Sequence, residues 1–442
     1  MRILLIQSLS TEDTSKEKVY PLGIVLLADR LRAAGQQATV LDMNLEADPF
    51  GALKERLLTF CPDVVGISLR NIDPLGNSST SLLPPFIVTV RLVASLCAKV
   101  SIIVGGTGFS LFPRRVMQEV PEIRYGIVGE AEEALPILLS SLENPPFLQG
   151  LCWREGRSIK VLPPAQQFDM RGYTIPDRNV LHPHQYLDVN RYVPAIGIES
   201  KRGCQFHCAY CLYPKLQGRR LRCRPPTAVV DEMDMLHQEY GVESFHFTDP
   251  VVNVPSGHLE AICEELLRRK LKIRWNGFMR EDFLEARNMA LFVRAGCESF
   301  SFSPDGLGQE AMDRLHKELK EEDVIRVARL AARTGVTCVY HFMVSVPGQS
   351  PESLEKGISF LSRLYELHNP SKTLGAVVLN NIRILPGTRL EKLARDEGVI
   401  GAKTDLLYPV YYSRTPFDSF RYRLETMSLW QNVFMWQEVR CK

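Results

Sequence analysis

Three cysteines close together in the sequence have the residue type and spacing of metal-cluster ligands. Cys204, Cys208 and Cys211 form the pattern CxxxCxxC within residues 201–211. An ordinary cysteine-ligated [4Fe–4S] cluster takes four thiolates, so a cluster held by these three keeps one iron open. An open iron can bind a small molecule from solution and pass an electron to it. The sequence therefore predicts an iron–sulfur site with redox chemistry at the open iron.

Other metal sites and disulfides explain the three cysteines less well. A zinc site usually needs a fourth Cys or His at a compatible spacing. His207 lies inside the loop between two ligands, whereas Cys223 follows twelve residues after the third cysteine and could serve in principle. Eleven cysteines in 442 residues are also too few for a disulfide-stapled secreted domain.

The residues around the cysteines indicate which cluster chemistry to expect. Gly203 stands directly before the first cysteine and Tyr210 directly before the third. This loop resembles that of the radical S-adenosylmethionine (SAM) enzymes, in which an aromatic, cofactor-binding residue takes the position of Tyr210. The resemblance implies that the amino and carboxylate groups of SAM chelate the open iron, and that an electron from the cluster cleaves a C–S bond of the sulfonium. It also implies an external electron donor of the flavodoxin or ferredoxin type.

The composition is that of an ordinary soluble protein with more than one domain. A chain of 442 residues suggests two or three domains. A share of 45% hydrophobic and 24% charged residues is average. The net charge of +2 gives no reason to expect a nucleic-acid partner. No stretch approaches the roughly 18 apolar residues of a membrane helix, and we expect a cytoplasmic protein.

The cysteine loop follows the first of a series of strands that alternate with helices. The expected strands are residues 195–199, 244–248, 272–275, 299–303, 337–344 and 376–384, and the longest expected helices are residues 227–240, 259–269, 321–334 and 352–367. This alternation predicts a parallel sheet with crossover helices. It fits the partial (β/α)6 TIM-type barrel of radical SAM proteins, which we place at residues 193–389.

Polar residues follow several of these strands at the ends where barrel enzymes gather their functional groups. Asp249 and Asn253 follow the second strand in a segment that resembles the Asp-x-x-Phe-Asn form of one radical SAM branch. They are expected to face the amino group of SAM. Asp305 follows the fourth strand, where the family has an acidic residue facing the ribose. Arg383 lies at the end of the sixth strand, and we also assign it to cofactor binding.

The first third of the chain predicts a second domain of the same class. Strands are expected at residues 2–7, 38–41, 64–68 and 100–104, with a helix at 22–34 that Gly35 would end. The alternation predicts a doubly wound parallel sheet, in which ligands bind beyond the carboxyl ends of the strands. The predicted fold is therefore α/β throughout, with a Rossmann-like domain ahead of the partial barrel.

The strand ends of this first domain carry residues that let a large ligand approach the backbone closely. The candidate binding residues are Ser68, Gly105, Gly106, Gly108, Gly129 and Glu130. With the Pro21-Leu22-Gly23 turn, their order resembles the cobalamin-binding domain that precedes the barrel in the cobalamin (B12)-dependent subfamily of radical SAM enzymes. The resemblance covers residues 1–143. Ala131 departs from it, because the family more often has a second glycine there.

Arg70 is the residue that we expect beneath the corrin ring. The first histidine of the chain is His182, so the domain offers no imidazole to the cobalt. The sequence around Arg70 resembles the arginine-bearing loop of the tryptophan 2-C-methyltransferases of thiopeptide biosynthesis. A guanidinium stays protonated and is not a practical cobalt ligand, so Arg70 would keep the lower face free and favour methylation. We assign it a catalytic role; the alternative is an ion pair with Asp73.

Two segments lie outside the predicted domains. Residues 144–192 contain scattered prolines and little periodicity, and we interpret them as an ordered connector. Residues 390–442 are interpreted as a C-terminal cap, either packed on the barrel or covering the substrate. The side chains considered for this cap are Tyr408, Tyr411, Tyr412, Arg414, Phe417, Phe420, Arg421, Trp430 and Trp436.

The resemblance as a whole implies a methyltransferase. SAM would methylate cobalamin, and methylcobalamin would transfer the methyl group to an unactivated carbon, or less often phosphorus, of a small-molecule or peptide substrate that the sequence does not identify. One alternative is rearrangement, cyclisation or coupling without net methylation. Another is methylthiolation of tRNA, but Cys61, Cys97 and Cys152 lack the spacing for a second cluster. A non-catalytic cobalamin-binding redox sensor would have no need of the CxxxCxxC loop.

Overall fold

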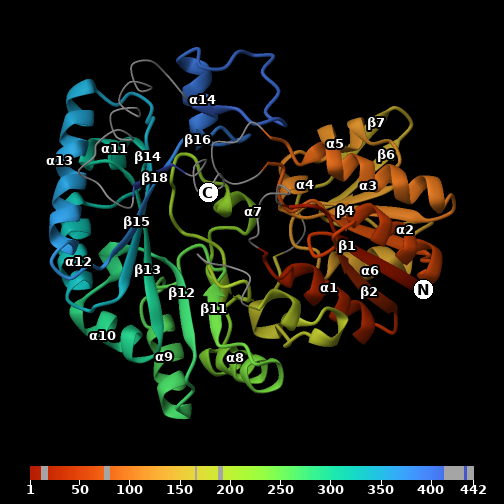
Figure 1. The fold of residues 1–442 in the computed structure, drawn as a ribbon. Coiled ribbons are helices and arrows are strands. Elements are labelled where there is room, and N and C mark those ends of the chain that lie inside the picture. The colour runs from red at the N-terminus through yellow and green to blue at the C-terminus, as the bar shows by residue number, and fades with distance from the viewer. Residues whose placement is uncertain (11–17, 74–79, 165–166, 188–192, 413–432, 436–442) are drawn as a thin grey trace. The chain divides into compact units, whose positions relative to one another are not determined.

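The computed structural model describes residues 1–10, 18–73, 80–164, 167–187 and 193–412, and the backbone of 433–435. The chain divides into two compact units (Figure 1). Among the described residues, the first comprises residues 1–73 and 80–187, and the second comprises residues 193–412 and 433–435. Each unit contains one seven-stranded sheet.

The first unit is built on a sheet that is parallel over most of its width. Its strands, in sheet order, are β2 (Gln37–Asp42), β1 (Arg2–Gln7), β3 (Val64–Ser68), β4 (Ser101–Gly105), β5 (Tyr125–Ile127), β6 (Leu151–Glu155) and β7 (Ser158–Val161). The first five pair in parallel, and β6 and β7 add an antiparallel hairpin. The predicted doubly wound sheet is confirmed, with strand order reversing between β1 and β3.

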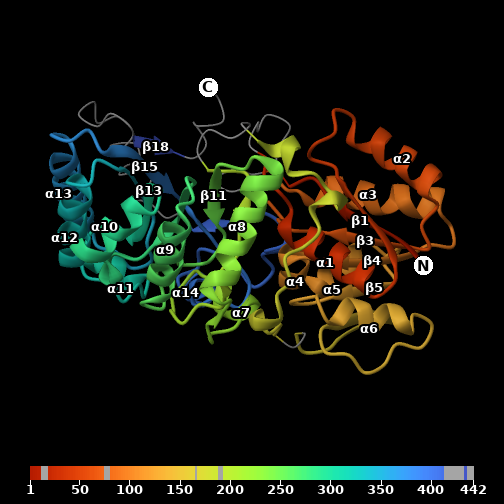
Figure 2. The same cartoon turned by 90° about the horizontal axis from the view of Figure 1, so that it is seen from below.

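Helices cover both faces of this sheet, which explains its continuously apolar strands. The helices are α1 (Leu22–Ala33), α2 (Pro49–Phe60), α3 (Leu83–Leu96), α4 (Thr107–Leu111), α5 (Pro113–Glu119) and α6 (Ala134–Ser140). Figure 2 shows α2 and α3 on one face and α1 and α6 on the other. Strand β1 is buried from Ile3 to Gln7, as expected for a parallel strand between two helical layers.

The segment predicted as a connector belongs structurally to the first unit. Its first part forms the hairpin β6–β7, which extends the sheet. Its later part forms the 3-10 turns η1 (Met170–Gly172), η2 (Arg178–Val180) and η3 (Pro183–Tyr186). The Tyr186 hydroxyl donates to Asp42 Oδ2 at 2.6 Å, and the Tyr20 hydroxyl donates to the Leu181 carbonyl at 2.7 Å. These buried hydrogen bonds attach the segment to β2 and to the residues just before α1 in the first unit.

The second unit contains the open, parallel sheet expected of a partial barrel. Its strands, in sheet order, are β18 (Val433–Met435), β15 (Leu374–Asn380), β14 (Thr337–Met343), β13 (Cys297–Gly306), β12 (Arg274–Met279), β11 (Ser244–Phe247) and β8 (Gly197–Ile198). All neighbours pair in parallel. The six predicted strands are present, and β18 adds a seventh from the segment predicted as a cap.

Helices pack along the outer face of this sheet (Figure 1). The helices of the unit are α7 (Tyr213–Leu216), α8 (Pro226–Tyr240), α9 (His258–Arg269), α10 (Ala286–Arg294), α11 (Gln309–Arg314), α12 (Glu321–Ala332), α13 (Pro351–His368) and α14 (Arg389–Asp396). Helix α12 buries Val324, Val327, Ala328 and Ala331, which is the spacing of one helical face. The sheet and these helices form the core that holds the loops at the carboxyl ends of the strands.

Short ribbons organise the loops of the second unit. Strand β9 (Lys201–Arg202) pairs with β10 (Arg222–Cys223), and β16 (Ile382–Arg383) pairs with β17 (Tyr411–Tyr412). A 3-10 turn, η4 (Glu281–Phe283), follows β12. Among the described residues, no helix is both long and apolar enough to cross a membrane. The side chains considered for the cap that lie outside the described residues are Arg414, Phe417, Phe420, Arg421, Trp430 and Trp436.

Candidate functional site

The loop that carries the three cysteines is fixed by backbone hydrogen bonds to two other loops of the second unit. The Cys204 N–H donates to the Gly218 carbonyl at 3.1 Å, and the Ala209 N–H donates to the Leu315 carbonyl at 2.8 Å. Gly203 has a φ of +95°, and a Cβ there would lie 2.2 Å from the Arg220 carbonyl oxygen. Only glycine satisfies both conditions, so the Gly-Cys sequence has a steric cause.

The structure brings the three predicted ligands together. Cys204 and Cys208 lie in an apolar cluster that includes Phe206, Val254 and Phe283. Burial raises the pKa of the Cys204 thiol, and the nearby Cys208 raises it further. Burial likewise raises the pKa of Cys211 to about 12, with further contributions from Cys208 and Cys204. The three sulfur atoms are therefore electrostatic neighbours.

This donor set fits a cluster better than a single metal ion. Within the described residues, no three His, Cys, Asp or Glu side chains surround one point at which a single ion could sit. In a [4Fe–4S] cluster each cysteine binds a different iron, so such convergence is not required. Cys223, the alternative fourth ligand, lies on β10 opposite Lys201. Metal binding would deprotonate the three thiols, because a coordinating thiol loses its proton outright.

A buried ion pair lies beside the cysteines. Lys317 Nζ is 2.7 Å from Asp305 Oδ2, and the Tyr210 hydroxyl donates to the same carboxylate oxygen. Burial lowers the pKa of Lys317, but the charges of Asp305 and Cys208 outweigh it and raise that pKa above its ordinary value. Lys317 therefore stays protonated and presents a fixed positive charge to the cysteine loop.

Arg280 connects the cysteine loop to the turn that carries Lys317. Its guanidinium lies over the Phe206 ring, 3.9 Å from the centroid. It donates to the carbonyls of Lys317 and Glu318 at 2.7 and 2.9 Å, and its Nη2 is 2.8 Å from Asp282 Oδ2. A planar guanidinium can stack and donate in several directions at once, which a lysine cannot do.

The backbone around this ion pair is strained. Asp305, His316 and Glu318 have φ values of +61°, +53° and +51°, and none of them is a glycine. A left-handed conformation at such residues costs on the order of 1–3 kcal/mol each and persists only where the surroundings enforce it. Strain of this kind gathers at functional sites. Lys317, which the sequence reasoning missed, lies between two of the three strained residues.

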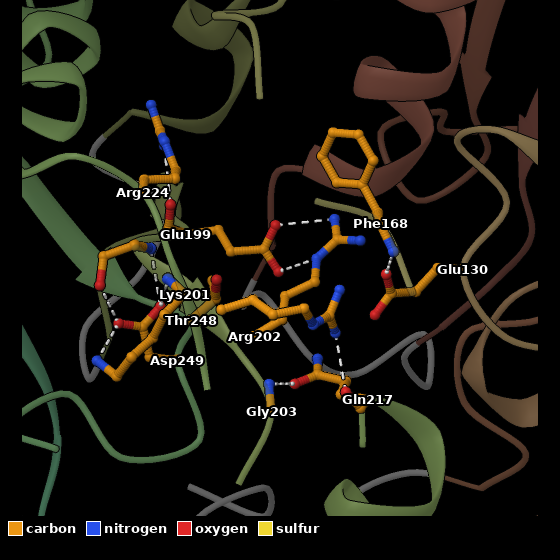
Figure 3. A network of polar contacts seen from close by, with 12 residues as sticks. Glu130, Phe168, Glu199, Lys201, Arg202, Gly203, Gln217, Arg224, Thr248 and Asp249 are labelled. Carbon is orange, nitrogen blue, oxygen red and sulfur yellow. Dashed lines mark hydrogen bonds and ion pairs between the residues drawn. The ribbon is translucent and has the colours of Figure 1, made fainter. Parts of the chain in front are cut away.

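Asp249 makes different contacts from those the sequence predicts. Its Oδ1 accepts hydrogen bonds from the backbone N–H groups of Ser200 and Lys201 at 2.8 and 3.2 Å. Its Oδ2 accepts from the Ser200 hydroxyl and from Lys201 Nζ at 2.9 Å (Figure 3). The Asp249 side chain is 0% exposed. The carboxylate therefore anchors the strand that leads to Cys204 and leaves no exposed oxygen for SAM.

The side chains of Asn253 and Arg383 also form hydrogen bonds with backbone groups. The Asn253 side-chain amide donates to the Arg280 carbonyl at 2.8 Å and accepts from the Arg280 N–H at 3.0 Å. It thereby joins the loop after β11 to the end of β12. Arg383 donates to the carbonyls of Ile384 and Leu406 at 2.7 and 2.9 Å. Both side chains therefore position backbone, and their contact with SAM stays a prediction.

In the first unit, the predicted glycines hold the loop that carries Arg70. Gly106 has a φ of +98°, and a Cβ there would lie 2.7 Å from the Leu69 carbonyl oxygen. A Cβ at Gly108 would lie 2.9 Å from the same oxygen. The Gly108 N–H donates to the Arg70 carbonyl at 2.9 Å, and the Arg70 side chain is exposed. The glycines thus let the turn after β4 pack on the loop after β3 and fix the position of Arg70.

The other predicted residues of this unit lie at the same edge of its sheet. Ser68 and Gly105 end the neighbouring strands β3 and β4 and pair with each other. Gly129, with a φ of +94°, donates its N–H to Ser110 Oγ at 3.0 Å. Glu130 Oε2 accepts from the Phe168 N–H at 2.6 Å (Figure 3). The edge fits a large ligand, because carboxyl ends beside a reversal of strand order form the usual binding crevice.

Comparison with known protein families assigns both units. Residues 198–361 match the Radical SAM superfamily, and residues 12–139 match the B12 binding domain. The first match contains all three cysteines, and the second contains Arg70 and all the predicted cobalamin-site residues. The cofactors predicted from the sequence are those of these two domains: a [4Fe–4S] cluster with SAM, and cobalamin.

Several curated proteins share both regions at low identity. The chain is 23% identical over 372 residues to an uncharacterized methyltransferase of Pyrococcus horikoshii, covering 82% of this chain and 78% of that protein. It is 24% identical to the anaerobic magnesium-protoporphyrin IX monomethyl ester cyclase of Rubrivivax gelatinosus, covering 76% and 60%. It is 22% identical to the tryptophan 2-C-methyltransferase of Streptomyces laurentii, covering 78% and 68%. The matched region is thus less than two thirds of the cyclase.

Two solved structures share the fold. The radical SAM methyltransferase TsrM of Kitasatospora setae, with tryptophan and a SAM analogue bound, matches with a TM-score of 0.75 and 21% identity, covering 91% of this chain and 77% of that one. The cobalamin-dependent SAM radical enzyme OxsB, with aqua-cobalamin and SAM bound, matches with a TM-score of 0.78 and 16% identity, covering 97% and 66%. At these identities the likeness shows the fold.

Proposed function

Because the chain belongs to the cobalamin-dependent radical SAM enzymes, we propose that it transfers a methyl group from SAM, by way of cobalamin, to a poorly activated carbon of a small-molecule or peptide substrate. The observation that carries the proposal is the set of three cysteines, one buried and two half-buried, beside a buried cation, in a chain that also has a cobalamin-binding domain. When bound, the cluster supplies an electron for SAM cleavage and cobalamin supplies a nucleophilic cobalt that accepts a methyl group.

The residues of the second unit have distinct proposed roles. Cys204, Cys208 and Cys211 hold the cluster. Lys317 receives the carboxylate of SAM, because it is a buried cation next to the sulfur atoms. Its charge-assisted hydrogen bond would stabilise a carboxylate that has lost its water there. Asp305 holds Lys317, and its second oxygen is left for the ribose of SAM. Tyr210 positions Asp305 through its hydroxyl.

The test of the proposed function is anaerobic reconstitution of the full chain with iron, sulfide and cobalamin, followed by SAM and a low-potential reductant. Methyl transfer to cobalamin yields S-adenosylhomocysteine, whereas reductive cleavage of SAM yields 5′-deoxyadenosine. Formation of the first product supports methyl transfer. Formation of the second product alone favours a radical catalyst without net methylation, an alternative that the cyclase relatives keep open. Absence of both products from a preparation that holds both cofactors would contradict the proposal.

The reductant in the cell is proposed to be a small electron-transfer protein of the flavodoxin or ferredoxin type. Every cycle that cleaves SAM reductively consumes one electron from outside the chain. Replacing the chemical reductant with such a protein in the same assay tests this partner directly. A requirement for an unrelated reductant would contradict it.

Arg70 is proposed to lie beneath the cobalt of bound cobalamin. A guanidinium offers no lone pair, so Arg70 would give bound cobalamin no protein ligand and would leave its cobalt free to react with SAM. Arg70→Lys should retain cobalamin but form S-adenosylhomocysteine at least about tenfold more slowly, because it keeps the charge and loses the planar group. Arg70→His should add a nitrogen signal to the electron paramagnetic resonance spectrum of the Co(II) form.

A matched control for Arg70 is Arg91, an exposed arginine of α3 whose side chain is paired with Glu122. Arg91→Ala should leave both the spectrum and the rate unchanged. If Arg70→Ala behaves like Arg91→Ala in both measurements, Arg70 has no role at the cobalt. The methyl-transfer proposal would survive that result.

A further inference from the structure

Glu281, in the turn η4 after β12, is a buried acid that none of the proposed steps uses. The residue is 1% exposed, and among the described residues no residue other than Glu281 itself donates a hydrogen bond to either carboxylate oxygen. An ionised carboxylate without partners in such a place loses its hydration and gains nothing in return. The surroundings of Glu281 therefore favour its protonated form.

The turn that carries Glu281 packs directly on the cysteine loop. Phe283 of the same turn is in the apolar cluster with Cys204 and Cys208. The Phe283 ring lies edge-on to the Phe206 ring at 6.2 Å between centroids. Glu281 thus lies in a turn that contacts the cysteine loop through Phe283, and no described hydrogen bond or ion pair links Glu281 to the cysteines.

The charged groups around Glu281 come from every element packed against it. On its own segment these are Arg280 and Asp282, and the turn after α11 contributes Lys317. Strand β14 contributes the buried Tyr340, which is neutral because burial raises the pKa of its hydroxyl. Helix α12 contributes Arg326, which donates to the Leu284 carbonyl at 2.7 Å and is paired with Asp323.

Each cation of this group already has its own carboxylate. Lys317 pairs with Asp305 at 2.7 Å, Arg280 pairs with Asp282 at 2.8 Å, and Arg326 pairs with Asp323 at 2.9 Å. Ionised Glu281 would therefore add an uncompensated negative charge. A cluster with three thiolates also becomes more negative when it gains an electron, so the two charges oppose each other.

We propose that Glu281 is a proton-holding residue that sets the electron affinity of the cluster. While Glu281 keeps its proton, it adds no negative charge near a bound cluster, which could then take an electron from the low-potential reductant without that opposition. When Glu281 has lost its proton, reduction becomes less favourable unless the carboxylate takes up one proton from water. The inference rests on the proposed function, because it requires a cluster at Cys204, Cys208 and Cys211.

The ionisation of Glu281 falls in an accessible pH range. Burial raises its pKa to about 8, although the backbone N–H of Glu281 and the charges of Lys317 and Arg280 act in the opposite direction. Below that pH the reduction potential should be constant. Above that pH the reduction potential should fall by at most about 59 mV per pH unit. For one electron, this fall corresponds to a tenfold change in the equilibrium constant of reduction.

The test is a redox titration of the reconstituted full chain at pH 6.5 and pH 9, followed by electron paramagnetic resonance of the reduced cluster. Wild type should be harder to reduce at pH 9, whereas Glu281→Gln should have the same potential at both. A matched control is Glu322→Gln, which removes an exposed carboxylate from the first turn of α12. This control should keep the pH dependence of wild type.

Each outcome bears on a specific claim. A wild-type preparation that binds no cluster would overturn the proposed function. A cluster whose potential has the same pH dependence in wild type and Glu281→Gln would overturn the role of Glu281 and leave the proposed function standing. If Glu281→Gln does not fold, Glu281→Met, which fills a similar volume, should show the same loss of pH dependence.

A stability measurement gives an independent readout of the same proton. The folded pKa of Glu281 lies above its unfolded value, so its contribution to stability is fully present below the unfolded pKa and is lost as the pH rises through about 8. Wild type should therefore lose more stability than Glu281→Gln between pH 6 and pH 9 in thermal denaturation without cofactors. Equal losses would show that Glu281 is already ionised in the folded protein.

Discussion

Replacing any one of Cys204, Cys208 and Cys211 with alanine should remove the absorbance of the iron–sulfur cluster and all SAM cleavage. Each thiolate is proposed to bind a different iron, so the loss of one leaves a second iron without a protein ligand. Burial raises the pKa of the Cys204 and Cys211 thiols, so without metal these two favour the protonated form. The measurement is iron and sulfide content after anaerobic reconstitution, together with 5′-deoxyadenosine formation.

Cys223 provides a control within the same region. It lies on β10, paired with the strand that leads into the cysteine loop, and it is the fourth ligand that a zinc site would need. Cys223→Ala should bind four irons per chain, as expected for wild type with a [4Fe–4S] cluster. A triple alanine variant of the three proposed ligands that still held four irons would disprove the assignment.

The cysteine site could be predicted because its information is local. Three ligands within eight positions, preceded by a glycine, define a loop regardless of the fold around it. The same holds for β1, β3 and α1, whose apolar runs and helical spacing gave bounds that agree with the structure to within a residue. Local sequence therefore determined where the site is and which elements support it.

The partners of Asp249 and Asp305 could not be predicted, because they come from distant parts of the chain. Asp249 binds Lys201, which is 48 positions earlier, across the neighbouring strands β11 and β8. Lys317 reaches Asp305 only because His316 and Glu318 adopt left-handed backbone conformations. Glutamate does not signal such a conformation, and histidine signals it far less than glycine does. The acidic residues were correctly placed at strand ends, but their bonding depends on tertiary structure.

The strands of the connector and the tail were also not predicted from the sequence. Strands β6 and β7 are five and four residues long and only partly apolar, so their periodicity is weak. They are stable because β5 offers a sheet edge. Likewise, β18 is three residues long and exists through pairing with β15. A strand that is stabilised by pairing with an existing sheet edge has only a weak β pattern in its own sequence.

Breaking the buried pair of Lys201 and Asp249 should have the second large effect, and it acts on folding rather than on chemistry. The two side chains are 1% and 0% exposed. Removing one partner leaves the other charge buried and unpaired, which typically destabilises by about 3–5 kcal/mol. Asp249→Ala also removes the acceptor for the backbone N–H groups of Ser200 and Lys201. Cluster content should therefore fall together with the free energy of unfolding, measured by urea denaturation.

An exposed pair of the same type supplies the control. Lys392 and Asp396 are one helical turn apart on α14, at 2.7 Å, with side chains 77% and 56% exposed. Asp396→Ala should change the free energy of unfolding little, because exposed ion pairs contribute little to stability. Comparable losses in Asp249→Ala and Asp396→Ala would contradict the anchoring role of the buried pair.

Asp249→Asn separates the two roles that the sequence and the structure assign to this residue. If Asp249 faces SAM, the amide should leave stability unchanged and weaken SAM binding to a folded, cluster-containing protein. If it anchors the loop, the amide leaves Lys201 without a counter-charge, so stability and cluster content fall first. Adding Lys201→Met to Asp249→Asn should then recover part of the lost stability, because the buried charge is gone. Such recovery in a double-mutant cycle is expected only of a buried pair whose function is to hold the strand before Cys204.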